Sequence, residues 1–295
     1  MRAAGRFAPS PTGALHVGNL RTALLAWLFA RSQGSAFMLR MEDLDSSRVR
    51  HGIEAQQLAD LTALGLDWDG PVLRQSERHA RYQDAVDSLE AAGRLYPCFC
   101  TRAEIRAAVS APHEPLPEGV YPGTCRKLTA SQRAARLAEG RPPALRIRAD
   151  EQRIGFLDRV HGECAGVVDD FVVRRNDGAF AYNLAVVVDD AALAVGEVVR
   201  GDDLLTSTPR QLLLYRLLEL PPPRHAHVPL VLGPDGRRLA KRHGDVTLRE
   251  LSAARALAWM AGSLGLSPGG AAPELLAGFS PDAVPRTPAT FPPSP

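Results

Sequence analysis

The sequence predicts an α/β protein built on a parallel β-sheet, into which a segment of different character is inserted. A short apolar strand at residues 6–7 runs into a Pro/Gly turn, a helical pattern follows over 19–30, and a second apolar strand covers 36–41. The order strand, helix, strand is typical of a parallel α/β unit. Residues 95–183 interrupt this pattern with clustered cysteines and a Pro-rich loop, and the α/β pattern returns after them.

The remaining elements follow from the spacing of apolar residues. A spacing of three or four residues indicates a helix, and a short apolar run bounded by turn residues indicates a strand. We expect helices over 51–64, 78–92, 209–220 and 248–264, and strands over 145–148, 184–190 and 196–200.

Composition limits the classes of function that this chain can have. Its 295 residues are 45% apolar and 23% charged, as in ordinary soluble globular proteins. The formal net charge of +2 is far below that of a protein that captures nucleic acid by charge alone, so any RNA contact must come from a shaped site. Neither a signal peptide nor an apolar run of membrane-spanning length is evident, so we expect a cytoplasmic protein, and we further expect a monomer.

The turn after the first strand, residues 9–19 (PSPTGALHVGN), is the first candidate site. A turn that opens a helix presents backbone N–H groups to an anion. His16 can donate a hydrogen bond to a phosphate, and Gly18 lets a base or a phosphate approach the backbone. The alternative is a tight strand-to-helix turn with a solvent-facing histidine, because so short a pattern recurs by chance.

A basic loop, residues 236–244 (GRRLAKRHG), is the second candidate site. It carries four cations within six positions, framed by glycines. A loop of this kind can stabilise the charge that develops on a triphosphate during reaction. The alternative is a solvated basic turn.

Charged residues beside the ends of expected strands, Arg6, Glu42, Asp43 and Arg200, form the third candidate site. A zwitterionic substrate with two carboxylates needs one anion for its ammonium group and one cation for each carboxylate. Arginine suits carboxylates because its planar guanidinium binds them through two parallel hydrogen bonds. Taken singly, each of these residues reads as an ordinary surface charge.

Taken in order along the chain, these motifs resemble the class I aminoacyl-tRNA synthetases of the glutamyl type. The resemblance covers roughly residues 6–250, and five ordered motifs are far more specific than any one of them. These motifs are 6–13 (RFAPSPTG) with 16–19 (HVGN); 40–45 (RMEDLD); 177–190 (DGAFAYNLAVVVDD); 199–203 (VRGDD) with 207–211 (STPRQ); and 238–242 (RLAKR).

The resemblance implies that the chain activates glutamate with ATP as glutamyl adenylate. His16, Gly18 and Lys241 would act in catalysis, and the same residues with Asn19 would bind ATP, which brings Mg2+ with it. Glu42 would meet the ammonium group of glutamate, and two arginines would face its carboxylates. The expected glutamate-binding residues are Arg6, Phe7, Ala8, Pro9, Ser10, Glu42, Tyr182 and Arg200.

The resemblance also implies how the chain is divided. Residues 1–94 and 184–247 are expected to form the two halves of a Rossmann-like, nucleotide-binding catalytic domain. Residues 95–183 are expected to form an inserted α+β subdomain, similar to an acceptor-binding domain and containing a zinc site. A short helical segment covers 248–266, and the tail, 267–295, is rich in Pro, Gly, Ala and Ser, so we expect it to be disordered.

The length of the chain favours one branch of the family. About one further helix follows the basic loop, which leaves no room for the helical region with which full-length members read the anticodon. A shortened paralogue in this family lacks the same region and attaches glutamate to the queuosine base of tRNA(Asp). We therefore expect ATP, L-glutamate and queuosine-containing tRNA(Asp) as partners.

Other functions remain alternatives. The chain could be a truncated conventional enzyme that charges the 3′ end of a tRNA. A nucleotidylyltransferase on the same scaffold would share the first motif but would not need the glutamate pocket, and a tRNA-binding module would form no adenylate. Ala240 stands where the family usually has Ser, which removes a hydroxyl from the basic loop but keeps Lys241.

Cys98, Cys100 and Cys125 are candidate metal ligands, because disulfides are rare in a reducing compartment. Zinc takes four ligands in a tetrahedron. The paralogue's pattern, Cys-x-Cys followed by Tyr-x3-Cys, resembles this sequence and implies Tyr121 as the fourth ligand, with Cys164 and His113 as rivals. We expect one structural zinc ion; the alternative is a set of buried thiols without metal.

Overall fold

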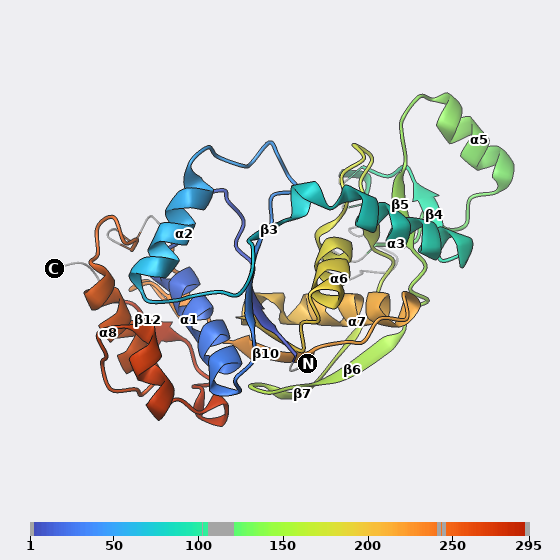
Figure 1. Cartoon of the computed structure of the whole chain (residues 1–295). Helices are drawn as coiled ribbons and strands as arrows, with labels where there is room; N and C mark the ends of the chain where they lie inside the picture. The colour runs from blue at the N-terminus through green and yellow to red at the C-terminus, as the bar shows by residue number, and fades with distance from the viewer. Residues whose placement is uncertain (1–2, 102, 106–120, 241–242, 244–245, 293–295) are drawn as a thin grey trace.

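Strands and helices alternate along the chain (Figure 1). The computed structural model describes residues 3–101, 103–105, 121–240, 243 and 246–292. The first part contains β1 Gly5–Phe7, α1 Val17–Ser32, β2 Phe37–Met41, α2 Ile53–Ala63, β3 Leu73–Arg74 and α3 His79–Ala91. The middle part contains β4 Leu95–Cys98, α5 Ala130–Ala138, β5 Ala144–Ile147, β6 Arg153–Asp158, β7 Gly162–Val167 and β8 Val172–Arg174. The last part contains α6 Tyr182–Ala192, β9 Glu197–Gly201, α7 Thr208–Leu217, β10 Arg224–Val228, β11 Val231–Leu232, α8 Ala253–Ser263 and β12 Ala289–Thr290. Short 3₁₀ segments are η1 Gln75–Glu77, η2 Asp202–Ser207, η4 Ala272–Gly278 and η5 Pro281–Ala283.

Parallel strands form the centre of the molecule. β1, β2 and β3 pair in parallel, and β10 pairs in parallel with both β9 and β6. A parallel bridge between Ala4 and Val195, with a hydrogen bond of 3.0 Å from the Ala4 amide to the Ala194 carbonyl, joins the two groups of strands. The joined order is β3-β2-β1-β9-β10-β6-β7, which confirms the predicted α/β class with a parallel sheet.

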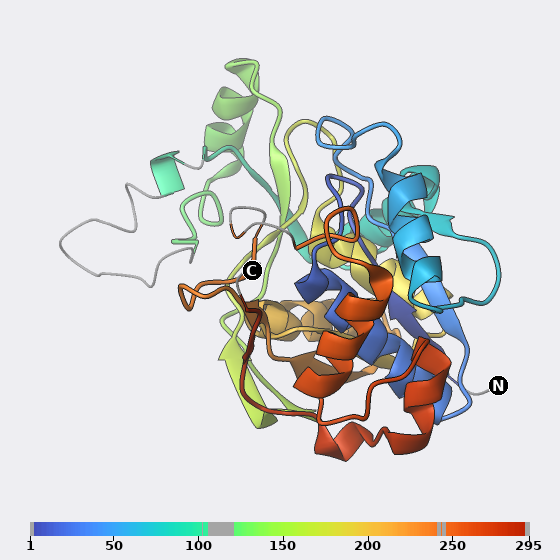
Figure 2. The same ribbon diagram turned by 90° about the vertical axis from the view of Figure 1, so that its left-hand side faces the viewer.

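Helix α1 is the core of the N-terminal half. Its residues from 20 to 30 are buried on nearly all sides except at Thr22, which is typical of a helix covered by packing partners all round. It packs on β1 and β9 on one side, while α8 and η4 cover the other (Figure 2). Even so, no helix in the described part of the chain combines the length and the apolar content that crossing a bilayer requires.

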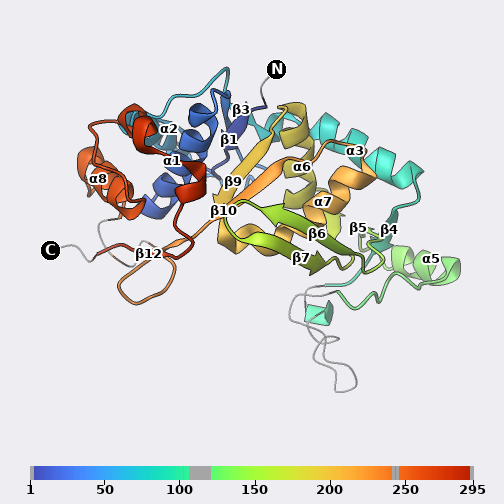
Figure 3. The same ribbon diagram turned by 90° about the horizontal axis from the view of Figure 1, so that it is seen from below.

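A second, smaller sheet lies at the edge of the molecule. β4, β5 and β8 pair antiparallel in the order β4-β5-β8, and α5 projects from them with no buried residue (Figure 1). We call β4, α5, β5 and β8 the small subdomain. The hairpin of β6 and β7 also comes from residues 95–183, but it extends the main sheet beyond β10 (Figure 3).

Two predicted elements differ in the structure. Residues 184–190, expected as a strand, lie in α6, because a short apolar run has the same appearance in a buried helix and in a buried strand. The final helix was expected from residue 248, but α8 begins at Ala253. There the Ser252 side chain accepts a hydrogen bond from the Arg255 amide at 3.3 Å and caps the helix.

The tail follows a defined course up to residue 292, contrary to the disorder expected for 267–295. β12 pairs in parallel with β11, and the Phe291 ring packs on Trp259 at 4.9 Å in an edge-to-face arrangement. Phe279 packs on Phe29 of α1 at 5.5 Å. The composition of the tail predicts disorder because the tail has too few apolar side chains to form a core of its own. In the structure these few side chains order the tail by docking on a core that the rest of the chain supplies.

Phe291→Ala tests this packing. Phe291 is 7% exposed, so removing its ring should lower the free energy of unfolding by about 3 kcal/mol. Urea unfolding measures the change, with the exposed Thr287→Ala as a control that should stay within about 0.5 kcal/mol of the unmodified chain. An unchanged midpoint in Phe291→Ala would mean that the tail is not docked in solution.

Candidate functional site

A cavity of about 810 Å³ opens at the carboxyl ends of β1, β2 and β9. Ligands of parallel α/β sheets bind at this edge. Lys241 lies outside the described residues. Asp43 of the third candidate site does not line this cavity; its carboxylate accepts from the Ser76 amide at 2.8 Å and the Ser76 hydroxyl at 2.6 Å. The other residues predicted to bind glutamate or ATP all line the cavity. These residues are Arg6, Phe7, Ala8, Pro9, Ser10, His16, Gly18, Asn19, Glu42, Tyr182 and Arg200.

The turn after β1 is held by Gln57, a residue that sequence reasoning missed. Gln57 in α2 is 1% exposed, and its side-chain amide donates to the carbonyl oxygens of Ser10 at 3.0 Å and Gly13 at 2.8 Å. The Glu42 amide donates to the Pro9 carbonyl at 2.9 Å. These bonds fix the turn against β2, so that Ser10 and Glu42 face the same cavity. A glutamine on a helix carries no local signal of this role.

His16 caps the N-terminus of α1. Its Nδ1 accepts from the Asn19 amide at 3.3 Å, and the Asn19 side chain accepts from the His16 amide at 3.3 Å. Because Nδ1 accepts, the neutral ring carries its proton on Nε2. A Cβ atom at Gly18 would lie 3.0 Å from the His16 ring, so glycine makes room for the imidazole. The positive end of the α1 dipole thus opens beside His16 into the cavity, which suits a phosphate.

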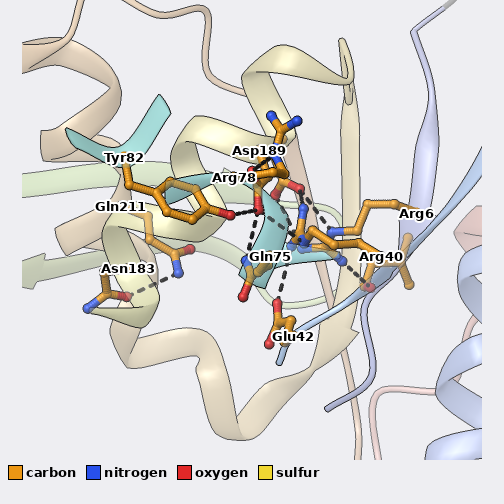
Figure 4. A network of polar contacts seen from close by, with 11 residues as sticks. Arg6, Arg40, Glu42, Gln75, Arg78, Tyr82, Asn183, Asp189 and Gln211 are labelled. Carbon is orange, nitrogen blue, oxygen red and sulfur yellow. Dashed lines mark hydrogen bonds and ion pairs between the residues drawn. The ribbon is translucent and has the colours of Figure 1, made fainter. Parts of the chain in front are cut away.

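A buried ion-pair network includes Arg6 and Glu42, which line the cavity, and we call this network the floor of the cavity (Figure 4). Asp190 in α6 is 1% exposed and accepts from Arg6 through Nε at 3.3 Å and Nη2 at 3.4 Å. The same carboxylate pairs with Arg40, which is fully buried and also donates to Glu42 at 3.2 Å. Burial opposes the ionisation of Asp190, but Arg6 and Arg40 outweigh it and lower the pKa of this carboxyl. Burial raises the pKa of Glu42 against the attraction of the same two arginines.

Asp189, the neighbour of Asp190, ties α6 to α3 and to the segment before it (Figure 4). It is 0% exposed and accepts from Gln75 at 2.8 Å, Arg78 at 2.6 Å and Tyr82 at 2.9 Å. Sequence reasoning missed these three partners, since they lie more than a hundred positions away from Asp189. Tyr182 and Asp189 are seven residues apart, which is close to two helical turns, so both lie on the same face of α6. The contacts that hold Asp189 therefore also orient the face that carries Tyr182.

Arg200 in β9 has a different set of partners from the other two arginines. It is 5% exposed, and it donates from Nε to His227 Nε2 at 3.0 Å and from Nη2 to Thr208 Oγ1 at 2.9 Å. Within the described ranges, its Nη1 has no hydrogen-bond partner and its guanidinium forms no ion pair. A buried guanidinium without a carboxylate is costly, so this group is suited to a carboxylate of a ligand.

Both ends of the basic loop lie against the cavity wall. Leu239 is joined to Val231 by a backbone hydrogen bond of 2.8 Å, and Val246 is joined to Val17 by one of 2.7 Å. The loop therefore leaves the end of β11 and returns to the start of α1, where His16 is. Lys241 lies outside the described residues, and its catalytic role stays a prediction.

Three cysteines converge in the small subdomain. The sulfur atoms of Cys98, Cys100 and Cys125 lie within 4.8 Å of one another. The Tyr121 hydroxyl lies 3.4 Å from the Cys98 sulfur and 3.7 Å from the Cys100 sulfur, and the Cys100 and Cys125 sulfurs are 3.4 Å apart. A tetrahedral site with Zn–S distances of about 2.3 Å places its ligand atoms roughly 3.5–3.8 Å apart. The three cysteines are therefore close enough to hold a metal ion, and the Tyr121 hydroxyl lies beside two of them.

Neighbouring groups hold Tyr121 in place, and of its two rivals only Cys164 lies among the described residues. The Tyr121 amide donates to Asp169 at 3.0 Å, and the Arg146 guanidinium lies over the tyrosine ring at 3.7 Å from its centroid. Cys164 lies in β7 and does not belong to the three-cysteine group, so it is not the fourth ligand. His113, the other rival, lies outside the described residues.

The chain is similar to a family model, to two curated relatives and to a solved structure. The family model for "tRNA synthetases class I (E and Q), catalytic domain" matches residues 3–256. A glutamyl-Q tRNA(Asp) synthetase of Nocardia farcinica is 59% identical over 97% of this chain and 92% of its own length. Another of that name, from Symbiobacterium thermophilum, is 55% identical over 85% of this chain and 81% of its own length. The crystal structure of a glutamate tRNA ligase from Elizabethkingia meningosepticum in complex with its amino acid has a TM-score of 0.83 at 28% identity, covering 99% of this chain and 67% of that one.

Asp190→Asn tests the floor of the cavity. Removing the carboxylate between two buried guanidinium groups should lower the free energy of unfolding by about 3–5 kcal/mol at neutral pH. The folded-state pKa of Asp190 is lowered, so its stabilisation is complete above its unfolded pKa, near ~4, and is lost as the pH falls through the folded pKa. The difference between the variant and the unmodified chain should therefore shrink in urea titrations below about pH 4. If the difference in unfolding free energy between the variant and the unmodified chain were the same at neutral pH and below about pH 4, the proposed ion pairs would be contradicted.

Proposed function

The chain belongs to the class I tRNA synthetases (E and Q), and we propose that it activates glutamate with ATP and transfers the glutamyl group to the queuosine base of tRNA(Asp). The enzyme is therefore a ligase. Its family acts with two amino acids, glutamate and glutamine, so the site has to decide between them. ATP, L-glutamate and the tRNA are its substrates.

The choice of glutamate as the amino-acid substrate rests on one observation: the buried Arg200 has no carboxylate partner among the described residues. Arg6 and Arg200 both line the cavity, and Arg200 forms no ion pair with any described carboxylate. Glutamate offers one carboxylate to each guanidinium, whereas glutamine would leave one guanidinium facing a neutral amide. Glu42, which also lines the cavity, takes the ammonium group.

Activation needs positioning and charge, and no protein nucleophile. An oxygen of the glutamate α-carboxylate forms a bond to the α-phosphorus of ATP, the bond from that phosphorus to the bridging oxygen breaks, and pyrophosphate leaves. The start of α1 with His16, Gly18 and Asn19 steadies the phosphates, and Lys241 stabilises the charge on the leaving pyrophosphate. Mg2+ accompanies the nucleotide as part of this substrate.

Transfer completes the reaction. A hydroxyl oxygen of the acceptor attacks the acyl carbon of the adenylate, AMP leaves, and the hydroxyl proton is released. The queuosine acceptor is supported by the relatives that share the name glutamyl-Q tRNA(Asp) synthetase, since they match the chain at higher identity and over more of their own length than the glutamate tRNA ligase does.

We assign a structural zinc ion to Cys98, Cys100, Cys125 and Tyr121. The fit rests on the spacing of three sulfurs and one phenol oxygen. Four protein ligands leave no open position for a substrate, so the ion would contribute folding energy and not chemistry. It would hold the end of β4 to the segment at 121–125.

Arg200→Gln tests the amino-acid assignment. We expect the glutamate KM in ATP–pyrophosphate exchange to rise roughly 10- to 100-fold, because a charge-assisted hydrogen bond is lost, while the ATP KM stays within about twofold. Arg31→Gln, which removes ion pairs to Asp67 and Asp69 away from the cavity, is the matched control. An unchanged glutamate KM in Arg200→Gln would refute the assignment, and exchange without glutamate would indicate a nucleotidylyltransferase.

The acceptor is tested with labelled glutamate and three RNAs: tRNA(Asp) with queuosine, tRNA(Asp) without it, and tRNA(Glu). We expect label on the first alone. Label on tRNA(Glu), irrespective of queuosine, would instead identify an enzyme that charges the 3′ end.

Elemental analysis of the purified protein tests the metal. We expect one zinc ion per chain, lost in Cys125→Ser and weakened in Tyr121→Phe, because the phenyl ring keeps the packing but removes the oxygen. Cys164→Ser should keep its zinc, since Cys164 lies outside the cluster. Full zinc content in Cys125→Ser would overturn the assignment.

A further inference from the structure

Four buried polar side chains form a chain of hydrogen bonds behind the cavity. Asp158 ends β6, His227 lies in β10, Thr208 begins α7 and Arg200 lies in β9. Their exposed fractions are 1%, 0%, 0% and 5%. At this depth two donors or two acceptors cannot face each other without a large cost, so the pattern of protons along this chain of hydrogen bonds is determined.

Asp158 fixes the tautomer of His227. Its Oδ2 lies 2.7 Å from His227 Nδ1, and its Oδ1 accepts from the amides of Val160 at 2.9 Å and His161 at 3.0 Å. An ionised carboxylate only accepts, so Nδ1 carries the proton and Nε2 offers a lone pair. Arg200 Nε donates to that lone pair at 3.0 Å. The alternative tautomer would place two donors opposite each other, because arginine keeps its protons in proteins.

Thr208 holds a second nitrogen of the Arg200 guanidinium, Nη2. Its Oγ1 accepts from Arg200 Nη2 at 2.9 Å and lies 3.1 Å from His227 Nε2. Burial lowers the pKa of His227 despite the opposing hydrogen bond to Asp158, which keeps the ring neutral beside Arg200. Two of the three guanidinium nitrogens are thus held by the protein. The third, Nη1, is the one without a partner among the described residues.

We propose that Asp158, His227 and Thr208 are positioning residues that fix the plane of the Arg200 guanidinium and thereby set the affinity for glutamate. The inference rests on the proposed function, in which this guanidinium receives a carboxylate of glutamate. A planar fork binds a carboxylate well in one orientation only, and holding it there beforehand removes an entropic cost from binding. None of the three is among the residues that line the cavity.

Asp158→Asn tests the proposal at the level of one proton. Asp158 Oδ1 accepts from the backbone amides of Val160, His161 and His227 at 2.9, 3.0 and 3.3 Å, so the variant keeps its amide oxygen there. The NH2 group then takes the place of Oδ2, where it donates to His227 Nδ1 and loses the 3.1 Å hydrogen bond from the His227 amide. The ring proton then moves to Nε2 and opposes Arg200 Nε. We expect nitrogen NMR of His227 to show this change of tautomer, with a glutamate KM raised at least about tenfold and an ATP KM within about twofold.

Thr208→Val provides a second, isosteric variant, and it should raise the glutamate KM by about three- to tenfold. His225→Phe is the matched control: His225 lies on the same strand, 3% exposed, with its ring stacked parallel to His227 at 5.9 Å, and phenylalanine keeps that stacking. Its glutamate KM should stay within about twofold.

A glutamate KM that is unchanged in both Asp158→Asn and Thr208→Val overturns the proposal, as does a His227 that keeps its proton on Nδ1 in Asp158→Asn. The Arg200→Gln variant distinguishes a failure of this positioning proposal from a failure of the glutamate assignment itself. If Arg200→Gln raises the glutamate KM and the positioning variants do not, only this inference fails. If Arg200→Gln itself has no effect, the glutamate assignment fails with it.

Discussion

The ion pairs that the Asp190 carboxylate forms with two buried arginines hold the floor of the cavity together. This carboxylate lies between Arg6 of β1 and Arg40 of β2, and it allows two guanidinium groups to remain buried next to each other. Without it, two like charges would face each other with little screening by water. Because Asp190 comes from α6, the floor exists only once that helix is docked on the sheet. Arg6 and Glu42 are then held in place before any ligand arrives, as electrostatic catalysis requires.

The parallel sheet decides where the chemistry is placed. Arg6, Glu42 and Arg200 lie at or just beyond the carboxyl ends of three strands, and α1 begins at the same edge with His16 as its cap. The residues proposed to bind glutamate and those proposed to bind phosphate therefore line one cavity. The tail supports the side of the cavity next to the basic loop, because β12 pairs with β11, the strand from which this loop departs.

Particular elements show how far sequence reasoning reached. The apolar spacing around α1 and the short runs of β1 and β2 predicted these elements to within a few residues. The sequence predicts a strand over 184–190 because the apolar side chains there follow one another without a helical spacing, whereas in the structure this segment packs against α3 and α7 as part of helix α6. The tail was assigned to disorder from composition, which cannot reveal that Phe279 and Phe291 find aromatic partners far away in the sequence.

By itself, the sequence predicted most of the charged and polar side chains proposed to bind the substrates, because phosphate and carboxylate chemistry needs given side chains at given spacings along the chain; Asp43, which does not line the cavity, is the exception. Tertiary structure alone decided what stands behind those residues, and these supporting partners are Gln57, Gln75, Arg78, Asp158, Thr208 and His227. No local spacing encodes them. A buried donor must meet an acceptor, and which acceptor it meets is fixed only when distant helices and strands pack together.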